Sequence, residues 1–374
     1  MSEDALPEPD RIADAPHPRE TPELFGQGAA EAAFLDAFTA GRLHHAWMLT
    51  GPRGVGKATL AWRIARFLAS QPVVAGDDMF GAPPPPATLD TAPDHPVYRR
   101  SLALAEPGIL LCRRPWDEKT KKLRTAITVE EVRKLKSAFT LSATEGGWRV
   151  AIIDAMDEMN TAAANALLKL LEEPPERTVF LLVCHQPGRL LPTIRSRCRE
   201  LRLSTLGPEA LAAAVAQAGF AAEGDAEALA ELSAGSAGEA VRLATEGGLT
   251  LYAEVVARLA EAPNMNRAAL SRLADQAAGR DAAARYDLMV RLVDLALTRL
   301  ARRGATGQDA PEAAPQEAAT LARLAPTLAA AQAWAGLSES LAGRIAHARG
   351  VNLDPAQVML DTFLQLDATA RRLT

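Results

Sequence analysis

Cysteines are scarce in this sequence, and none of them lie at short spacing. The three cysteines are Cys112, Cys184 and Cys198, and no CxxC pattern occurs among the 374 residues. This scarcity argues against a disulfide framework and against a structural zinc site. We therefore expect no zinc and no other metal site in this protein.

Long apolar runs are also missing. The first 20 residues are polar and acidic and lack the apolar core of a signal peptide. The longest uncharged apolar run of note covers residues 324–338, contains Pro326, and is shorter than the roughly 20 residues that cross a bilayer. The sequence therefore predicts a cytoplasmic protein without a membrane contact, which begins with a flexible tail over residues 1–20.

An excess of positive charge is absent as well. Lys and Arg number 41 against 46 Asp and Glu, which gives a formal net charge of −5. General binding to nucleic acid is therefore not expected, and any contact with DNA must come from local basic patches or from a partner. The basic group between residues 119 and 136 is either a solvated face or such a patch.

Apolar residues make up 48 % of the chain, enough for two or three domains with sizeable cores. Strand and helix patterns alternate in the first half, which predicts an α/β domain with a parallel sheet. An irregular insertion, which contains the run PPPP and shows no clear period, is expected over residues 71–107. After about residue 205 only helical patterns remain. The expected strands are 46–50, 109–112, 150–153, 178–183 and 201–203.

The stretch GPRGVGKAT, residues 51–59, matches a phosphate-binding loop between a strand and a helix. In such a loop backbone N–H groups and a lysine hold the phosphates, and a following Ser or Thr holds magnesium. The matching residues are Gly51, Gly54, Gly56 and Lys57. The magnesium ligand is missing, because Ala58 has no oxygen and Thr59 lies roughly 100° further around the helix.

The second half of a nucleotide site is also incomplete. The apolar strand 150–153 ends in Asp154, the arrangement that supports magnesium from the opposite side. Hydrolases of this type usually have Glu next, where this chain has Ala155. Asp154 is either part of such a degenerate site or simply the end of a buried strand. With the loop upstream, we favour a site that no longer hydrolyses nucleotide.

Four stretches together give the chain a family resemblance. They are Gly26-Gln27, GRLHHAWMLTGPRGVGKATLA (41–61), WRVAIIDAMDEMNTAAANALLKLLEEPP (148–175) and LLPTIRSRCRELRL (190–203). The sequence resembles the bacterial clamp-loader subunits of the AAA+ class, and within that class it is most similar to the delta-prime subunits of DNA polymerase III. The resemblance implies an AAA+ domain over 21–205, a helical lid over 206–249 and a helical collar over 250–374. The four-cysteine zinc module of many relatives is missing.

The resemblance also assigns roles to residues. Ser196-Arg197-Cys198 matches a motif whose arginine is supplied in trans to the ATP site of the neighbouring subunit. Spacing alone leaves open an ordinary basic loop. Gly238 stands where the family's lid domain has an arginine that reaches the nucleotide. The implied function is therefore a non-hydrolysing clamp-loader subunit, part of a DNA-directed DNA polymerase holoenzyme, with Arg197 as its catalytic contribution.

The implied partners are the tau/gamma ATPase subunits and the delta subunit, and, through the complex, the sliding clamp and primer–template DNA. No cofactor is required, although the loop from Gly51 to Lys57 still permits ATP to bind. The alternative is a self-sufficient AAA+ ATPase that acts on DNA. The residues Ala58, Ala155 and Gly238 argue against that alternative, since each replaces a group that hydrolysis needs.

Overall fold

The structure is a computed structural model that describes residues 7–12, 15–72, 85–141, 147–220, 226–278 and 282–373. The chain forms two compact units. The first comprises residues 1–219 and 235–238, and the second comprises residues 220–234 and 239–374. The predicted boundaries of a lid and a collar domain stay predictions.

The first unit is built on a five-stranded sheet whose strands all run parallel. The order across the sheet is β2-β5-β6-β1-β7. β1 and β6 lie in the middle and are buried along their whole length, which explains their continuous apolar sequences. The strands are β1 (Ala46–Thr50), β2 (Ile109–Arg113), β5 (Arg149–Asp154), β6 (Thr178–Val183) and β7 (Arg199–Arg202).

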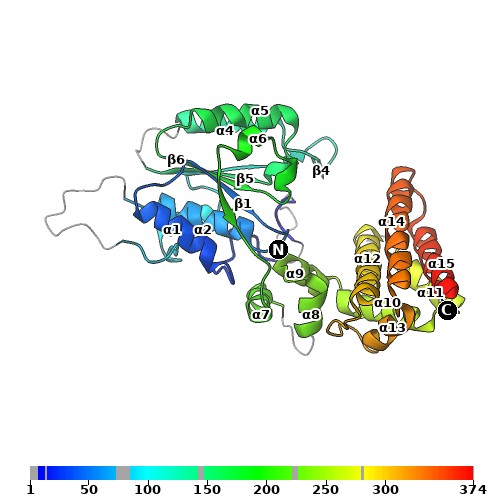
Figure 1. The fold of residues 1–374 in the computed structure, drawn as a ribbon. Coiled ribbons are helices and arrows are strands. Elements are labelled where there is room, and N and C mark those ends of the chain that lie inside the picture. The colour runs from blue at the N-terminus through cyan, green and yellow to red at the C-terminus, as the bar shows by residue number, and fades with distance from the viewer. Residues whose placement is uncertain are drawn as a thin grey trace. The chain divides into compact units, whose positions relative to one another are not determined.

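Helices cover both faces of this sheet, with α1 and α2 on one face and α4 and α5 on the other (Figure 1). Successive side chains of β1 alternate between the two layers: Trp47 and Leu49 pack with α1 and α2, whereas Met48 packs with α4 and α5. The predicted fold class, a P-loop α/β domain followed by helices, is confirmed. The helices are α1 (Gly28–Thr39), α2 (Lys57–Ala69), α4 (Val129–Leu141) and α5 (Thr161–Glu172).

Shorter elements complete the first unit. Part of the predicted irregular insertion is ordered, because α3 buries Val97 and Ser101, and the nearby Leu89 lies in the core. Residues 73–84 of that insertion lie outside the described residues. The short elements are α3 (Pro96–Leu102), α6 (Pro192–Arg195), α7 (Pro208–Gln217) and the two-stranded ribbon of β3 (Trp116–Asp117) and β4 (Lys122–Leu123).

The N-terminal segment, which we define as residues 7–12 and 15–20, packs against the first unit. His17 is fully buried and Arg19 is 8 % exposed. Glu8 and Asp10 both form ion pairs with Arg113 of β2. The structure therefore differs from the expected flexible tail, because these acidic side chains find cationic partners that lie far away in the sequence. Residues 1–6 are outside the described part of the chain.

The second unit is helical in its described residues, and α12, α14 and α15 run side by side in it (Figure 1). A buried polar cluster ties the unit together. The Glu317 carboxylate, 1 % exposed, accepts hydrogen bonds of 2.6 Å from both Tyr252 and Arg299, and one of 2.7 Å from the backbone N–H of Ala313. This cluster fixes the connector between α12 and α13.

The helices of this unit begin with α8 (Ala226–Ser233) and α9 (Ala237–Thr245), whose first two residues belong to the first unit. The others are α10 (Gly248–Glu261), α11 (Arg267–Asp275), α12 (Ala282–Thr306), α13 (Glu317–Leu324), α14 (Leu328–Gly350) and α15 (Pro355–Leu373). No helix in the described ranges has the length and apolar character needed to cross a membrane.

Candidate nucleotide site and arginine finger

The predicted phosphate-binding loop connects the end of β1 to the start of α2. Gly54 and Gly56 have φ angles of 78° and 99°, which residues other than glycine rarely adopt. Gly56 lies directly before Lys57, the first residue of α2. The glycines therefore shape the loop in the way that the sequence predicts, at the N-terminus of a buried helix.

The lysine of the loop is engaged with the loop's own backbone. Lys57 Nζ donates hydrogen bonds of 2.6 Å to the carbonyl of Gly51 and 2.5 Å to the carbonyl of Pro52. Lys57 is only 3 % exposed. Burial lowers its pKa to about 8, although the nearby Asp154 opposes the shift. The amine thus has internal partners in the place where a phosphate-binding lysine would reach a ligand.

Asp154 lies at the carboxyl end of β5 and is 9 % exposed. Burial raises its pKa to about 7, and the negative charges of Asp10 and Glu158 add to this, whereas Lys57 and Arg113 oppose it. Arg113 is paired with Asp154 across the β2–β5 register. The structure therefore brings Lys57 and Asp154 near each other, together with Asp10 and Arg113, which the sequence did not single out.

The position after Asp154 cannot supply a catalytic acid. Ala155 is 3 % exposed and packs into the core beneath α2. The two acids that follow are occupied elsewhere. Asp157 accepts a hydrogen bond from the backbone of His185, and Glu158 forms ion pairs of 3.1 Å with Arg53 and 2.7 Å with Arg114.

Residues 235–238 pack directly on the phosphate-binding loop, on the side of the site where the family resemblance places Gly238. The backbone N–H of Gly238 donates to the carbonyl of Gly54 at 2.9 Å, and the Ser236 hydroxyl donates to the carbonyl of Arg53 at 2.9 Å. A Cβ atom on Gly54 would lie 2.3 Å from Ser236 Oγ and 3.0 Å from Gly238 Cα. Gly238, which replaces the expected arginine, thus contacts the loop itself.

The residues at this site do not fit magnesium-bound ATP. Ala58 offers no oxygen to the metal, Ala155 is apolar, and Lys57 already has two carbonyl partners. Across the described ranges, His, Cys, Asp and Glu side chains form no group of three or more that could hold a metal ion. The site as folded is closed by contacts within the first unit.

The Ser196-Arg197-Cys198 motif lies between α6 and β7. The Arg197 side chain is 37 % exposed, and its Nη2 atom lies 2.9 Å from Oε1 of Glu172 at the end of α5. Its Nη1 atom donates to the carbonyl of Thr193 at 2.9 Å. Cys198 is partly buried, and burial raises the pKa of its thiol to about 12. The arginine is thus held at the surface by neighbours from α5 and α6.

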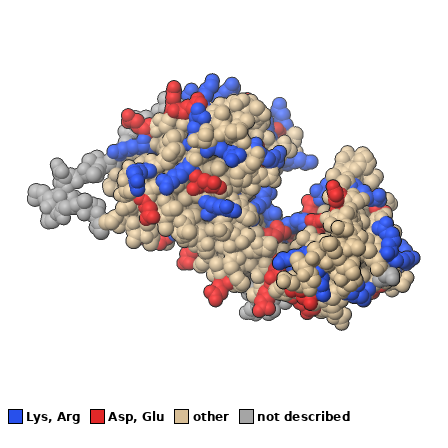
Figure 2. Space-filling view, in the orientation of Figure 1, with Lys and Arg blue, Asp and Glu red and all other residues tan. Residues whose placement is uncertain are grey.

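The basic group of the first unit is partly neutralised. Lys121, Arg124 and Lys134 form ion pairs with Glu118, Asp117 and Glu131, respectively. Figure 2 shows Lys and Arg side chains spread over the visible face of this unit, with acidic side chains between them. The structure therefore adds no support for a continuous surface that binds DNA.

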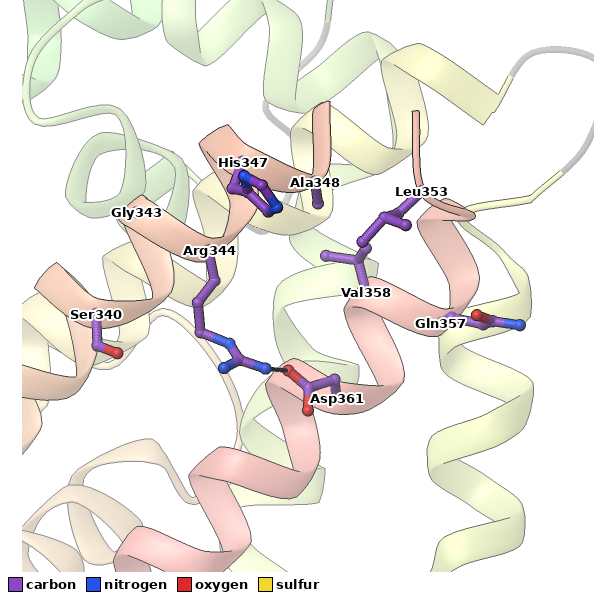
Figure 3. A pocket seen from close by; sticks show the side chains of 9 residues that line it. All are labelled: Ser340, Gly343, Arg344, His347, Ala348, Leu353, Gln357, Val358 and Asp361. Carbon is purple, nitrogen blue, oxygen red and sulfur yellow. Dashed lines mark hydrogen bonds and ion pairs between the residues drawn. The ribbon is translucent and has the colours of Figure 1, made fainter. Parts of the chain in front are cut away.

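A cavity of about 580 Å³ lies in the second unit between α14 and α15 (Figure 3). Arg344 and Asp361 point toward each other across it and form an ion pair of 2.5 Å. His347, Leu353 and Val358 also line it. None of the site residues predicted from the sequence belongs to this cavity.

Comparisons with known proteins agree with the family resemblance. Residues 101–207 match the family model described as DNA polymerase III, delta subunit. The chain is 38 % identical over 217 residues to the DNA polymerase III subunit delta' of Pseudomonas aeruginosa, which covers 57 % of this chain and 59 % of that protein. It is 31 % identical over 202 residues to the subunit gamma/tau of Mycobacterium tuberculosis, which covers 52 % of this chain and 30 % of that protein.

Solved structures are similar only weakly. A DNA polymerase III gamma subunit-related protein of Thermotoga maritima gives a TM-score of 0.42 at 16 % identity, with 90 % of this chain and all of that chain covered. The RuvB Holliday junction branch migration motor of the same organism gives 0.36 at 20 % identity, with 60 % and 63 % covered. The fold assignment rests on the sheet described above.

The chain spans 59 % of the length of its Pseudomonas aeruginosa relative and a smaller share of the gamma/tau relative. The matched part includes the strands and loops around Asp154 and Arg197, since both residues lie within the family match over 101–207. The predicted resemblance to the delta-prime subunits of DNA polymerase III is therefore confirmed over the part of the chain that these comparisons cover.

Proposed function

We propose that the chain is a non-hydrolysing subunit of the DNA polymerase III clamp loader. In this role it assists ATP-dependent loading of the sliding clamp on DNA during replication. The observation that carries the proposal is a contrast within the first unit: Lys57 donates to two carbonyls of its own loop, whereas Arg197 is presented at the surface. The chain thus retains what a neighbour needs and lacks what its own site needs.

Arg197 acts in trans on ATP that is bound by a neighbouring subunit. A guanidinium beside the transferred phosphoryl group stabilises the charge that develops as the bond breaks, and in other NTPases such an arginine is worth about 10³–10⁵ in rate. To reach a phosphate, Arg197 must exchange the carboxylate of Glu172 for phosphate oxygens. The exchange is inexpensive, because exposed ion pairs stabilise proteins by only about 0–1 kcal/mol.

The partners follow from the family role. The tau/gamma subunits supply the ATP sites, the delta subunit completes the loader, and the complex contacts the sliding clamp and primer–template DNA. Ser196 and Cys198 position the finger at that interface. The chain needs no nucleotide or zinc of its own, and it works in the cytoplasm, where replication takes place.

The test is steady-state ATP hydrolysis by the reconstituted loader that contains Arg197→Ala in this chain. We expect the assembly to form and its DNA-stimulated turnover to fall strongly, with little rescue by Arg197→Lys, since an ammonium cannot form the same pair of hydrogen bonds. Arg195→Ala is the matched control, because Arg195 is exposed two residues away. Full activity of the Arg197→Ala assembly would refute the role in trans.

Turnover by the purified chain alone would instead support the alternative, a self-sufficient ATPase that acts on DNA. That result requires hydrolysis that disappears with Lys57→Ala, which separates it from contamination. We expect no such hydrolysis, because Ala58 and Ala155 leave the site without a metal ligand and without an acid to orient water.

A further inference from the structure

We propose that the N-terminal segment is a built-in occupant of the degenerate nucleotide site, and that it excludes nucleotide from the phosphate-binding loop. This goes beyond the proposed function, which requires only that the chain does not hydrolyse ATP. A subunit of that kind could still hold ATP or ADP. The N-terminal segment would thus be one reason, within the chain itself, why the site does not accept magnesium-bound ATP.

The acidic side chains of this segment lie beside the carboxyl ends of β2 and β5. Asp10 Oδ1 lies 2.6 Å from Nη1 of Arg113, and Glu8 Oε1 lies 2.9 Å from Nη2 of the same guanidinium. Arg113 is the register partner of Asp154. In an active P-loop enzyme the carboxylate equivalent to Asp154 supports the metal at the phosphates. The segment therefore places the carboxylate of Asp10 close enough to Asp154 to act on its charge, and the carboxylate of Glu8 on the neighbouring Arg113 guanidinium.

Electrostatics supports the same placement. Burial raises the pKa of Asp154 most, and the negative charge of Asp10 makes the next largest contribution. The Asp10 side chain is 4 % exposed, and its Oδ2 atom lies 3.0 Å from Nε2 of His17, which is fully buried. Burial alone would raise the pKa of Asp10, but the contacts with His17 and Arg113 lower it. Asp10 is thus a buried carboxylate whose Oδ1 is paired with Arg113 and whose Oδ2 lies beside His17.

An apolar side chain of the segment also lies close to the residues that pack on the loop. Ile12 Cδ1 lies 3.3 Å from where a Cβ atom on Gly238 would be. Gly238 in turn donates its N–H to the carbonyl of Gly54 in the loop. Gly238 therefore contacts Gly54 of the loop, and Ile12 lies close to the same glycine. Any side chain at position 238 would collide with Gly54 Cα at 2.9 Å, so the glycine is what permits this layer.

The segment is also anchored at residues beyond the site. The rings of His17 and Trp62 of α2 are in edge contact, with centroids 6.3 Å apart. Arg19 pairs with Glu8 at 2.6 Å and donates to the carbonyl of Leu102 at 3.0 Å. Although burial of Glu8 acts in the other direction, these hydrogen bonds from Arg19 and Arg113 lower its pKa to about 2. The segment is therefore fixed at several points between α2 and the end of β2.

Nucleotide can bind only when this segment has left. If the segment is docked for about nine-tenths of the time or more, its removal should raise the apparent affinity about tenfold or more, since only the open fraction binds. The probe is a fluorescent ATP analogue, titrated with and without Mg²⁺ into the full chain and into a chain that lacks residues 1–20. We expect tighter binding by the shortened chain, and loss of that binding when Lys57→Ala is added.

Point variants protect the test from misfolding of the shortened chain. The double variant Glu8→Gln, Asp10→Asn keeps the shape of the segment but removes the charges that hold it. It should therefore also bind the analogue more tightly than the unsubstituted full-length chain. Glu118→Gln, which removes an exposed carboxylate paired with Lys121, is the matched control and should change nothing. Thermal unfolding of each variant verifies that it is folded.

Two results would overturn the proposal. Equal affinity of the full chain, the shortened chain and the double variant would mean that the segment does not compete with nucleotide. Absence of binding in all of them would mean that the loop is closed by its own contacts and that the segment excludes nothing. Neither result affects the role of Arg197, so the two proposals fail separately.

Discussion

Replacement of Glu172 by Gln tests how the arginine finger is held. The Glu172 and Arg197 side chains are 47 % and 37 % exposed, and the ion pair between them measures 2.9 Å. Exposed pairs of this kind contribute about 0.2–1 kcal/mol, which corresponds to a factor of about 1.4–5 in an equilibrium. Because Glu172 competes with phosphate oxygens for the guanidinium, Glu172→Gln should leave turnover of the assembly unchanged or raise it, by at most about fivefold.

The assay is steady-state ATP hydrolysis of the reconstituted loader at several salt concentrations. Salt screens exposed charges, since the Debye length falls from about 10 Å at 0.1 M to about 3 Å at 1 M, so any gain should shrink as salt rises. Glu173→Gln is the matched control, because Glu173 is the exposed next residue. If Glu172→Gln lowers turnover as much as Arg197→Ala does, Glu172 positions the finger, and the competition that we infer is refuted.

Three further predictions concern stability. The pKa of Asp154 is raised to about 7, so its ionisation lowers the free energy of unfolding as pH rises from about 4 to 7. Asp154→Asn should therefore have a free energy of unfolding up to about 4 kcal/mol above that of the parent at pH 8, and nearly the same at pH 4. Denaturant titration at both pH values measures the difference. Gly54→Ala should destabilise more than Gly41→Ala, because both have positive φ but only Gly54 would place its Cβ against other atoms; the strain alone costs about 1–2 kcal/mol, and equal losses would argue against the packed loop. Glu317→Ala should cost the second unit about 1–3 kcal/mol, since the buried Arg299 loses one hydrogen-bonded carboxylate but keeps Glu231 and the Pro311 carbonyl, whereas Arg344→Ala at an exposed pair should cost about 1 kcal/mol or less.

The parts of the fold that the sequence predicted are those set by local pattern. Continuous apolar runs identified the buried strands β1, β5 and β6, and the spacing of Gly54, Gly56 and Lys57 identified the loop between β1 and α2. Each of these signals lies within a dozen residues. The relation between Lys57 and Asp154 followed because the ends of parallel strands meet at one edge of a sheet.

What the sequence did not predict depends on contacts between distant residues. Asp10 and Arg113 are 103 positions apart, and composition alone made the first 20 residues resemble a tail. The packing of Gly238 on Gly54 could not be inferred, since a glycine carries no side-chain signal. One clue was present at Glu172, whose charge is unfavourable at a helix C-terminus, and its pairing with Arg197 accounts for it.

The central claim is that this chain gives a catalytic group to a neighbour and uses none itself. The most direct measurement compares ATP turnover by the reconstituted loader with either Lys57→Ala or Arg197→Ala in this chain. We predict that Lys57→Ala leaves turnover unchanged and that Arg197→Ala lowers it strongly. The reverse pattern, a loss with Lys57→Ala and full activity with Arg197→Ala, would show that the chain's own site is in use and would contradict the account.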